Sequence, residues 1–236
     1  FYKTNVWASG PILKDRLFFF AMYEQRDSNS RDIDTLEAWV TRGDNAFWGG
    51  KLDWRINDNH LLELLAFSDK AESATTTHDY VWDTAFLGQA TGEGITGSGG
   101  ENYSLTYTGR FSDTFVAKAM YGINKRRATD ISPTDALCSI VSTSSTYDNK
   151  FGKPTTPVGC HSDNSSINNR FDEREAARLD FEWTLGSHLL RFGIDHEVGD
   201  STSAQYYPGD GRSYSVQGES PGNVLPNGAQ VPAGVE

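Results

Sequence analysis

Four short polar turns, each set between strand-like runs, most limit how this chain can fold. The first lies within residues 10–20 (GPILKDRLFFF), and the same pattern recurs at residues 54–62, 109–116 and 183–190. In each, an apolar or aromatic residue ends one run, two to four turn formers follow, and an apolar run departs. This pattern is typical of β-hairpins. We therefore predict four hairpins and about eight antiparallel strands.

Side chains in these runs alternate with a period of two, which places them on opposite faces of a sheet. Residues 102–111, 115–124, 176–185 and 189–198 have the 9 to 11 residues, roughly, of a tilted membrane strand. One parity is apolar and the other is polar or charged. The apolar parity holds Trp48, Gly50, Leu52, Trp54, Tyr103, Leu105, Tyr107, Phe115, Ala117, Ala119, Tyr121, Ala177, Leu179, Phe181, Trp183, Leu190, Phe192 and Ile194. Phe18 and Phe20 are exceptions, because their parity places them on the charged side, which would be the lumen of a barrel, and there we expect them to pack against something inside the barrel.

Long connections separate the hairpins, and we predict loops over residues 27–45, 71–100, 128–172 and 199–236. Unstructured loops of this length are uncommon in compact soluble domains. A transmembrane antiparallel up-and-down β-barrel accounts for them, with short periplasmic turns and long extracellular loops. A soluble amphipathic sheet would show the same alternation. Aromatic residues beside the short turns, namely Trp54, Phe111, Phe115 and Trp183, favour the barrel, whose interfaces carry such residues.

Composition excludes several classes of function. The formal net charge of −11 argues against nucleic-acid binding, which needs clustered basic residues. No apolar run approaches the roughly 18 residues of a spanning helix. The five histidines are scattered and match no catalytic or metal-binding motif. Gly92, Gly94 and Gly97 match GxGxxG, but no helix pattern follows, and we predict a flexible loop there. We expect no enzymatic activity, no cofactor and no bound metal.

Cys138 and Cys160 both fall in the 128–172 connection. In an oxidising compartment they would form a disulfide worth roughly 3 kcal/mol by the loop-entropy estimate. The alternatives are free thiols or metal ligands with His161, although two cysteines and one histidine fall short of a zinc set.

The final connection offers candidate ligand contacts. Tyr206, Tyr207, Asp210 and Tyr214 combine aromatic rings with a carboxylate among turn formers. Such a composition suits ligand binding, and a plain surface turn is the alternative.

Residues 10–20 with Tyr23 and Glu24, followed by residues 51–54 and 57–61, resemble the barrel portion of Oar-like TonB-dependent receptors of the bacterial outer membrane. The resemblance covers about the first 70 residues, and the remainder follows it only in its rhythm of strands and loops. It implies a barrel of many more than eight strands, a plug domain and a TonB-type periplasmic energiser. The chain shows neither a plug nor a TonB-contact segment, and both ends look like cuts through a longer polypeptide. We therefore expect an arc of a larger barrel, whose edges pair with other strands because an open edge cannot lie in lipid.

The strand and loop pattern predicts an arc of a transmembrane β-barrel, and the resemblance implies TonB-dependent transport of a solute or peptide through a plugged barrel. The expected partners are outer-membrane lipid, the remainder of the barrel with its plug, and the TonB-type energiser. The alternative is a structural or adhesive surface protein, built as a small closed barrel or a soluble β domain, that binds partners through its long loops.

Overall fold

The computed structural model describes residues 1–143, 166–216, 222–224 and 228–230. The chain is all-β, and its described residues fall into two compact units. The first unit comprises residues 1–129 and 169–204, and the second comprises the described residues within 130–168 and 205–236.

Ten strands form one antiparallel sheet. They are β1 (Tyr2–Leu13), β2 (Leu17–Ile33), β3 (Glu37–Asn57), β4 (His60–Ser68), β5 (Ala71–Val81), β6 (Phe86–Ser98), β7 (Gly100–Ser112), β8 (Phe115–Ile131), β10 (Ile167–Leu185) and β11 (His188–Tyr206). A 3₁₀ turn, η1 (Trp82–Thr84), joins β5 to β6, while β9 (Ile140–Thr143) and β12 (Ser213–Val216) form a separate parallel pair.

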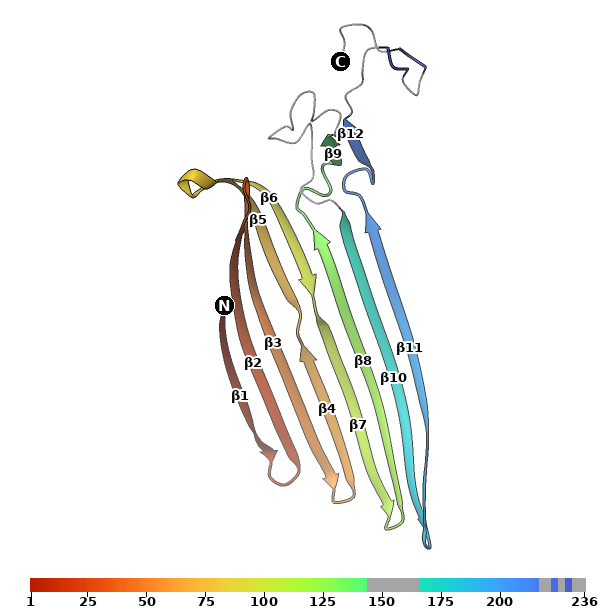
Figure 1. Cartoon of the computed structure of the whole chain (residues 1–236). Coiled ribbons are helices and arrows are strands. Elements are labelled where there is room, and N and C mark those ends of the chain that lie inside the picture. Colours follow the sequence, from red (N-terminus) through yellow and green to blue (C-terminus); the bar gives the residue numbers. More distant parts are fainter. Residues whose placement is uncertain (144–165, 217–221, 225–227, 231–236) are drawn as a thin grey trace. The chain divides into compact units, whose positions relative to one another are not determined.

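The path through the sheet follows the chain order β1-β2-β3-β4-β7-β8-β10-β11 (Figure 1). These strands contain the eight predicted from the sequence. Short turns join them in pairs as predicted, and the turn between β1 and β2 is closed by a hydrogen bond from the Arg16 amide to the Leu13 carbonyl (3.1 Å). Asp15 in that turn and Gly186 in the turn between β10 and β11 have positive φ angles of 59° and 60°. The up-and-down hairpin order is therefore confirmed.

The predicted loop boundaries are wrong, because described strands extend into every one of the four connections. Residues 28–33 of β2 pair with residues 38–43 of β3, leaving only residues 34–36 between the two strands. Residues 71–98 form the β5–β6 hairpin, so the glycine-rich segment predicted as a loop is part of a strand. Strands β8, β10 and β11 likewise extend beyond their predicted ends. Polar residues such as Thr75, Thr76 and Thr77 form these extensions, and a strand without an apolar face resembles a loop in composition.

The β5–β6 hairpin continues the β4–β7 pair after an interruption. Strand β3 pairs with β4 along one part and with β5 along another, and β8 pairs with both β7 and β6. Gly99 lies at the break with φ of 77°, and a Cβ there would come within 2.2 Å of the Asp69 carbonyl oxygen. The Gly100 amide donates to Asp69 Oδ1 (2.8 Å). Glycine is therefore required at position 99 by both its conformation and its close packing.

The sheet has almost no core of its own. Among the described residues, the buried hydrophobic side chains are Ala38, Ala117 and Ile167, whereas large apolar side chains are exposed along most strands. A single layer of strands has two faces to cover, and the chemistry of those faces is the main clue to function.

Candidate functional site

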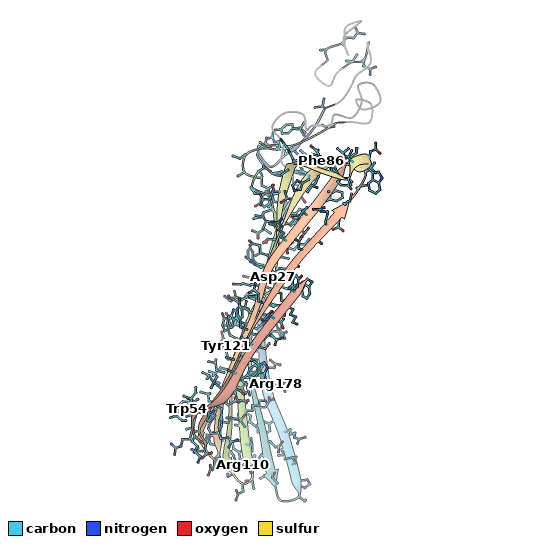
Figure 2. The ribbon with its side chains drawn as sticks, turned by 90° about the vertical axis from the view of Figure 1, so that its left-hand side faces the viewer. Asp27, Trp54, Phe86, Arg110, Tyr121 and Arg178 are labelled. Atoms are coloured by element: carbon cyan, nitrogen blue, oxygen red, sulfur yellow. The ribbon has the colours of Figure 1, made fainter. Side chains whose placement is uncertain are left out.

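One face of the sheet carries no charged side chain over a continuous area. Directly opposed residues share a face, so the strand registers identify its members. This uncharged face comprises Val6, Ala8, Gly10, Leu17, Phe19, Ala21, Tyr23, Trp48, Gly50, Leu52, Trp54, Leu62, Leu64, Ala66, Tyr103, Leu105, Tyr107, Ala117, Ala119, Tyr121 and Ile123. Figure 2 labels Trp54 and Tyr121 from this face, and Arg110 and Arg178 from the other. The predicted parity is confirmed for these strands.

Aromatic rings extend the uncharged face onto β10 and β11, close to the short turns. The ring centroid of Phe115 (β8) lies 5.8 Å from that of Phe181 and 6.3 Å from that of Trp183. Phe181 in turn stacks on Phe192 of β11 at 5.2 Å. On the other side, Phe111 lies 6.1 Å from Phe115.

His60 continues this aromatic row onto β4. Its ring lies 5.4 Å from that of Phe111, and its Nδ1 lies 2.7 Å from the Tyr107 hydroxyl. A histidine that the sequence assigns only to a turn is therefore a polar member of an aromatic row beside the short turns. Such a row combines apolar area with polar groups that can reach water.

The far boundary of the uncharged face runs obliquely across the strands. Tyr23 opposes Trp48 and Trp48 opposes Ser68, after which the same row continues through Glu101 to Lys125. Lys70 pairs with Glu101 (2.6 Å) and Lys125 with Glu173 (3.2 Å). This single row of paired residues is therefore uncharged on β2, β3 and β4 and charged on β7 and β8. When the strands of a barrel are tilted, an apolar band parallel to the membrane plane runs obliquely across the rows of paired residues.

The opposite face carries ion pairs between neighbouring strands. Lys51 of β3 bonds Asp53 and Glu63, each at 2.8 Å. Arg191 of β11 bonds Glu182 of β10 at 2.9 Å. Glu24 has little exposure and accepts from both Lys3 (2.9 Å) and Arg26 (2.5 Å). We refer to this side of the sheet as the charged face.

Phe18 and Phe20 lie on the charged face, opposite Asp53 and Lys51. The guanidinium of Arg55 lies 5.8 Å from the centre of the Phe18 ring, so a cation–π contact occupies one of the two rings. Phe20 remains 40% exposed. The predicted contact of these two rings with a group inside the barrel stays a prediction.

The four candidate ligand residues separate into two pairs. Tyr206 and Tyr207 line a cavity of about 330 Å³ in the second unit, together with Ile131, Ser132, Pro133, Asp135, Ala136, Ile167 and Gly209. Asp210 instead accepts hydrogen bonds from Ser139 Oγ (2.7 Å) and from the Tyr214 hydroxyl. Tyr214 lies in β12, which pairs with β9. Asp210 and Tyr214 therefore connect two segments, while Tyr206 and Tyr207 line the cavity.

Hydrogen bonding lowers the pKa of the Asp210 carboxyl. The Tyr214 hydroxyl contributes most, followed by Ser139. The same bond raises the pKa of the Tyr214 phenol. Both shifts hold Asp210 ionised and Tyr214 protonated, which are the states that this hydrogen bond needs.

The residues that frame the cavity were not among the candidates predicted from the sequence. Asp135 is 7% exposed, and its Oδ2 accepts from the Ser132 amide at 2.6 Å. Burial, and then the charge of Asp135, raise the pKa of nearby Asp130. The sequence Ser132-Pro133-Thr134-Asp135 is a turn signal that could have identified this frame. Its proximity to Tyr206 depends on pairing across distant segments.

Cys138 follows the turn at residues 132–137, where its amide donates to the Thr134 carbonyl (3.2 Å). Cys160 lies outside the described residues, so the predicted disulfide stays a prediction.

Within the described ranges, no group of three or more histidine, cysteine or acidic side chains could hold a metal ion. No helix in that part of the chain is long and apolar enough to cross a membrane.

No protein-family model, curated protein or solved structure matches this chain.

Proposed function

We propose that this chain is an arc of a transmembrane β-barrel in a bacterial outer membrane, and that the barrel is a TonB-dependent transporter of a solute or peptide. The observation that carries the membrane proposal is the uncharged face, which crosses strands β1 to β4, β7 and β8 without a charged side chain. Exposed apolar patches of more than a few hundred Å² mark an interaction surface. Acyl chains can cover such a surface without interruption.

The dimensions of the uncharged face support lipid as the covering partner. On β3 it extends from Trp48 to Trp54, and Ile56 continues the same parity toward the turn. Nine residues of strand span roughly 26 Å. A transmembrane β-strand tilted by about 45° needs roughly 9 to 11 residues, and nine residues fall at the lower end of that range. Aromatic residues at both ends, Trp48 and Tyr23 at one and Trp54 at the other, suit membrane interfaces.

The edges of the sheet set a requirement for this proposal. Strands β1 and β11 are the two ends of the strand path, and their residues are almost all exposed. Unpaired backbone groups in lipid cost several kcal/mol each, to order of magnitude. The edges therefore pair with further strands of the same barrel, and the charged face lines its lumen.

Transport driven by TonB rests on the resemblance of residues 10–24 and 51–61 to Oar-like receptors. In this mechanism, the outer connections capture the substrate and a periplasmic energiser then moves the plug. The rival function is a structural or adhesive surface protein that uses the same outer connections to bind partners.

Two adjacent leucines of β4 provide a matched test of the membrane proposal. Leu64 lies on the uncharged face, Leu65 lies on the charged face, and their exposures are 43% and 39%. We expect Leu64→Arg in the parent polypeptide, whose further strands pair with the edges of this arc, to abolish insertion into lipid vesicles, because a cation at the membrane midplane costs about 2 to 4 kcal/mol. Leu65→Arg should insert like the unmodified parent polypeptide. Vesicle flotation measures both variants, and equal insertion would contradict the assignment of the faces.

TonB dependence needs a separate experiment. We expect the parent polypeptide, extracted from outer membranes, to cross-link to the periplasmic domain of a TonB protein. Fractionation with the membrane but without a cross-link would favour the adhesive function. Recovery in the soluble fraction would contradict the membrane proposal and favour the alternative of a soluble β domain that binds partners through its loops.

A further inference from the structure

The tyrosine-lined cavity of the second unit has a stable frame. It lies among the end of β8, the turn at residues 132–138, the start of β10 and the segment after β11. The Gly209 amide donates to the Asp135 carbonyl at 2.6 Å, which joins the two segments that contribute most of the wall. Pro208, between the tyrosines and this bond, is fully buried. A frame held by these contacts needs little ordering when a ligand enters.

The residues that line the cavity favour a positively charged ligand. Of the nine lining residues, Asp135 carries a formal charge and none is basic. Tyr206 and Tyr207 are about half exposed, at 51% and 47%, so their rings remain accessible. Aromatic faces carry a negative potential that attracts organic cations.

A second carboxyl group adds to this potential. Asp130 ends the same strand that supplies Ile131 to the lining, and its pKa is raised by burial and by the charge of Asp135. Asp130 is not itself a lining residue, but its charge and that of Asp135 repel each other. A bound cation would relieve that repulsion, whereas an anion would increase it.

We propose that this cavity binds an organic cation, namely the ammonium or guanidinium group of an amine or a basic peptide, between the Tyr206 and Tyr207 rings and the Asp135 carboxylate. The proposed binding of a cation follows from the residues that line the cavity. Its role as the capture site for a transported substrate rests on the proposed function.

Benzylammonium and benzyl alcohol form a matched pair of probes, because they share a ring and differ in charge. Isothermal titration of the full chain in detergent micelles measures both. We expect saturable binding of benzylammonium and at least tenfold weaker binding of benzyl alcohol. Equal affinities, or no saturable binding of benzylammonium, would overturn the proposal.

Two substitutions separate charge from aromatic contact. Asp135→Asn retains an oxygen that can accept from the Ser132 amide, and it should weaken benzylammonium binding at least tenfold. Asp32→Asn removes the same charge from strand β2 and should leave binding unchanged. Wild-type affinity in Asp135→Asn, or an equal loss in both variants, would contradict a specific site.

Substitutions of Tyr207 provide a second test of the site in case Asp135→Asn perturbs folding. Tyr207→Phe preserves the ring and should bind as wild type does, whereas Tyr207→Leu should bind about threefold more weakly. Equal affinities of these two variants would overturn the aromatic part of the site. Vesicle insertion of the same samples distinguishes the two proposals: a chain that inserts but does not bind benzylammonium retains the membrane proposal and loses this one.

Discussion

At the scale of single residues, Gly209 determines whether its amide can reach the Asp135 carbonyl and hold the frame of the cavity together. Its φ is 67°, and a Cβ would lie 2.5 Å from the Ser139 backbone nitrogen. Gly211 has a similar φ of 79°, but a Cβ there would meet nothing within 4 Å. The two glycines therefore carry the same conformational requirement and differ in crowding.

We predict that Gly209→Ala destabilises the second unit by about 1 to 3 kcal/mol more than Gly211→Ala, because only the first adds a clash to an unfavourable φ. Limited proteolysis within residues 130–143 and 205–216 measures the difference. Equal protease sensitivity would show that crowding at Gly209 is unimportant.

Asp210 links the stability of the β9–β12 pair to pH. Its pKa lies below the ordinary value of an aspartate because the folded state hydrogen-bonds the ionised form. The stabilisation is therefore present above the unfolded pKa and is lost as pH falls through the lower folded pKa. We predict that Tyr214→Phe, which removes the main donor, raises the pKa of Asp210 toward 3.8. Carboxyl NMR titration tests this, and an unchanged pKa would exclude Tyr214 as the main cause.

At the scale of elements, the extensions of β2 and β3 behave as strands rather than loops. Ser30 opposes Thr41, and Thr41 Oγ1 lies 2.8 Å from Thr75 Oγ1 on β5, so three strands remain in register there. We predict slow amide hydrogen exchange at residues 38–43, whose strand has a partner on each side. Residues 34–36 provide the internal control and should exchange faster. Equally fast exchange in both segments would restore the loop assignment.

At the scale of the whole sheet, tryptophans report on which face meets lipid. Trp54 lies on the uncharged face, while Trp7, which opposes Met22, lies on the charged face. We predict that brominated lipids quench a single-tryptophan variant retaining Trp54 and leave one retaining Trp7 unquenched, because direct contact with acyl chains is required. Quenching of both would mean that lipid covers both faces.

The local part of this structure was predictable from the chain. Period-two alternation, as in Leu179 and Phe181 against Arg178 and Asp180, follows from strand geometry alone, and turn formers such as Asp15 mark the hairpins. The sequence by itself therefore determined the all-β class, the eight strands of the main path and the parity of their side chains.

Only the tertiary structure decided the features that depend on partners distant in the sequence. Thr75 to Thr77 look like loop residues until β3 and β6 pair with them on either side. Tyr206 and Asp135 are separated by a long stretch of chain, yet the bond from Gly209 to Asp135 brings their segments to one cavity. Polar strands and cavities gain their stability from non-local backbone pairing, which carries no periodic signal in the chain itself.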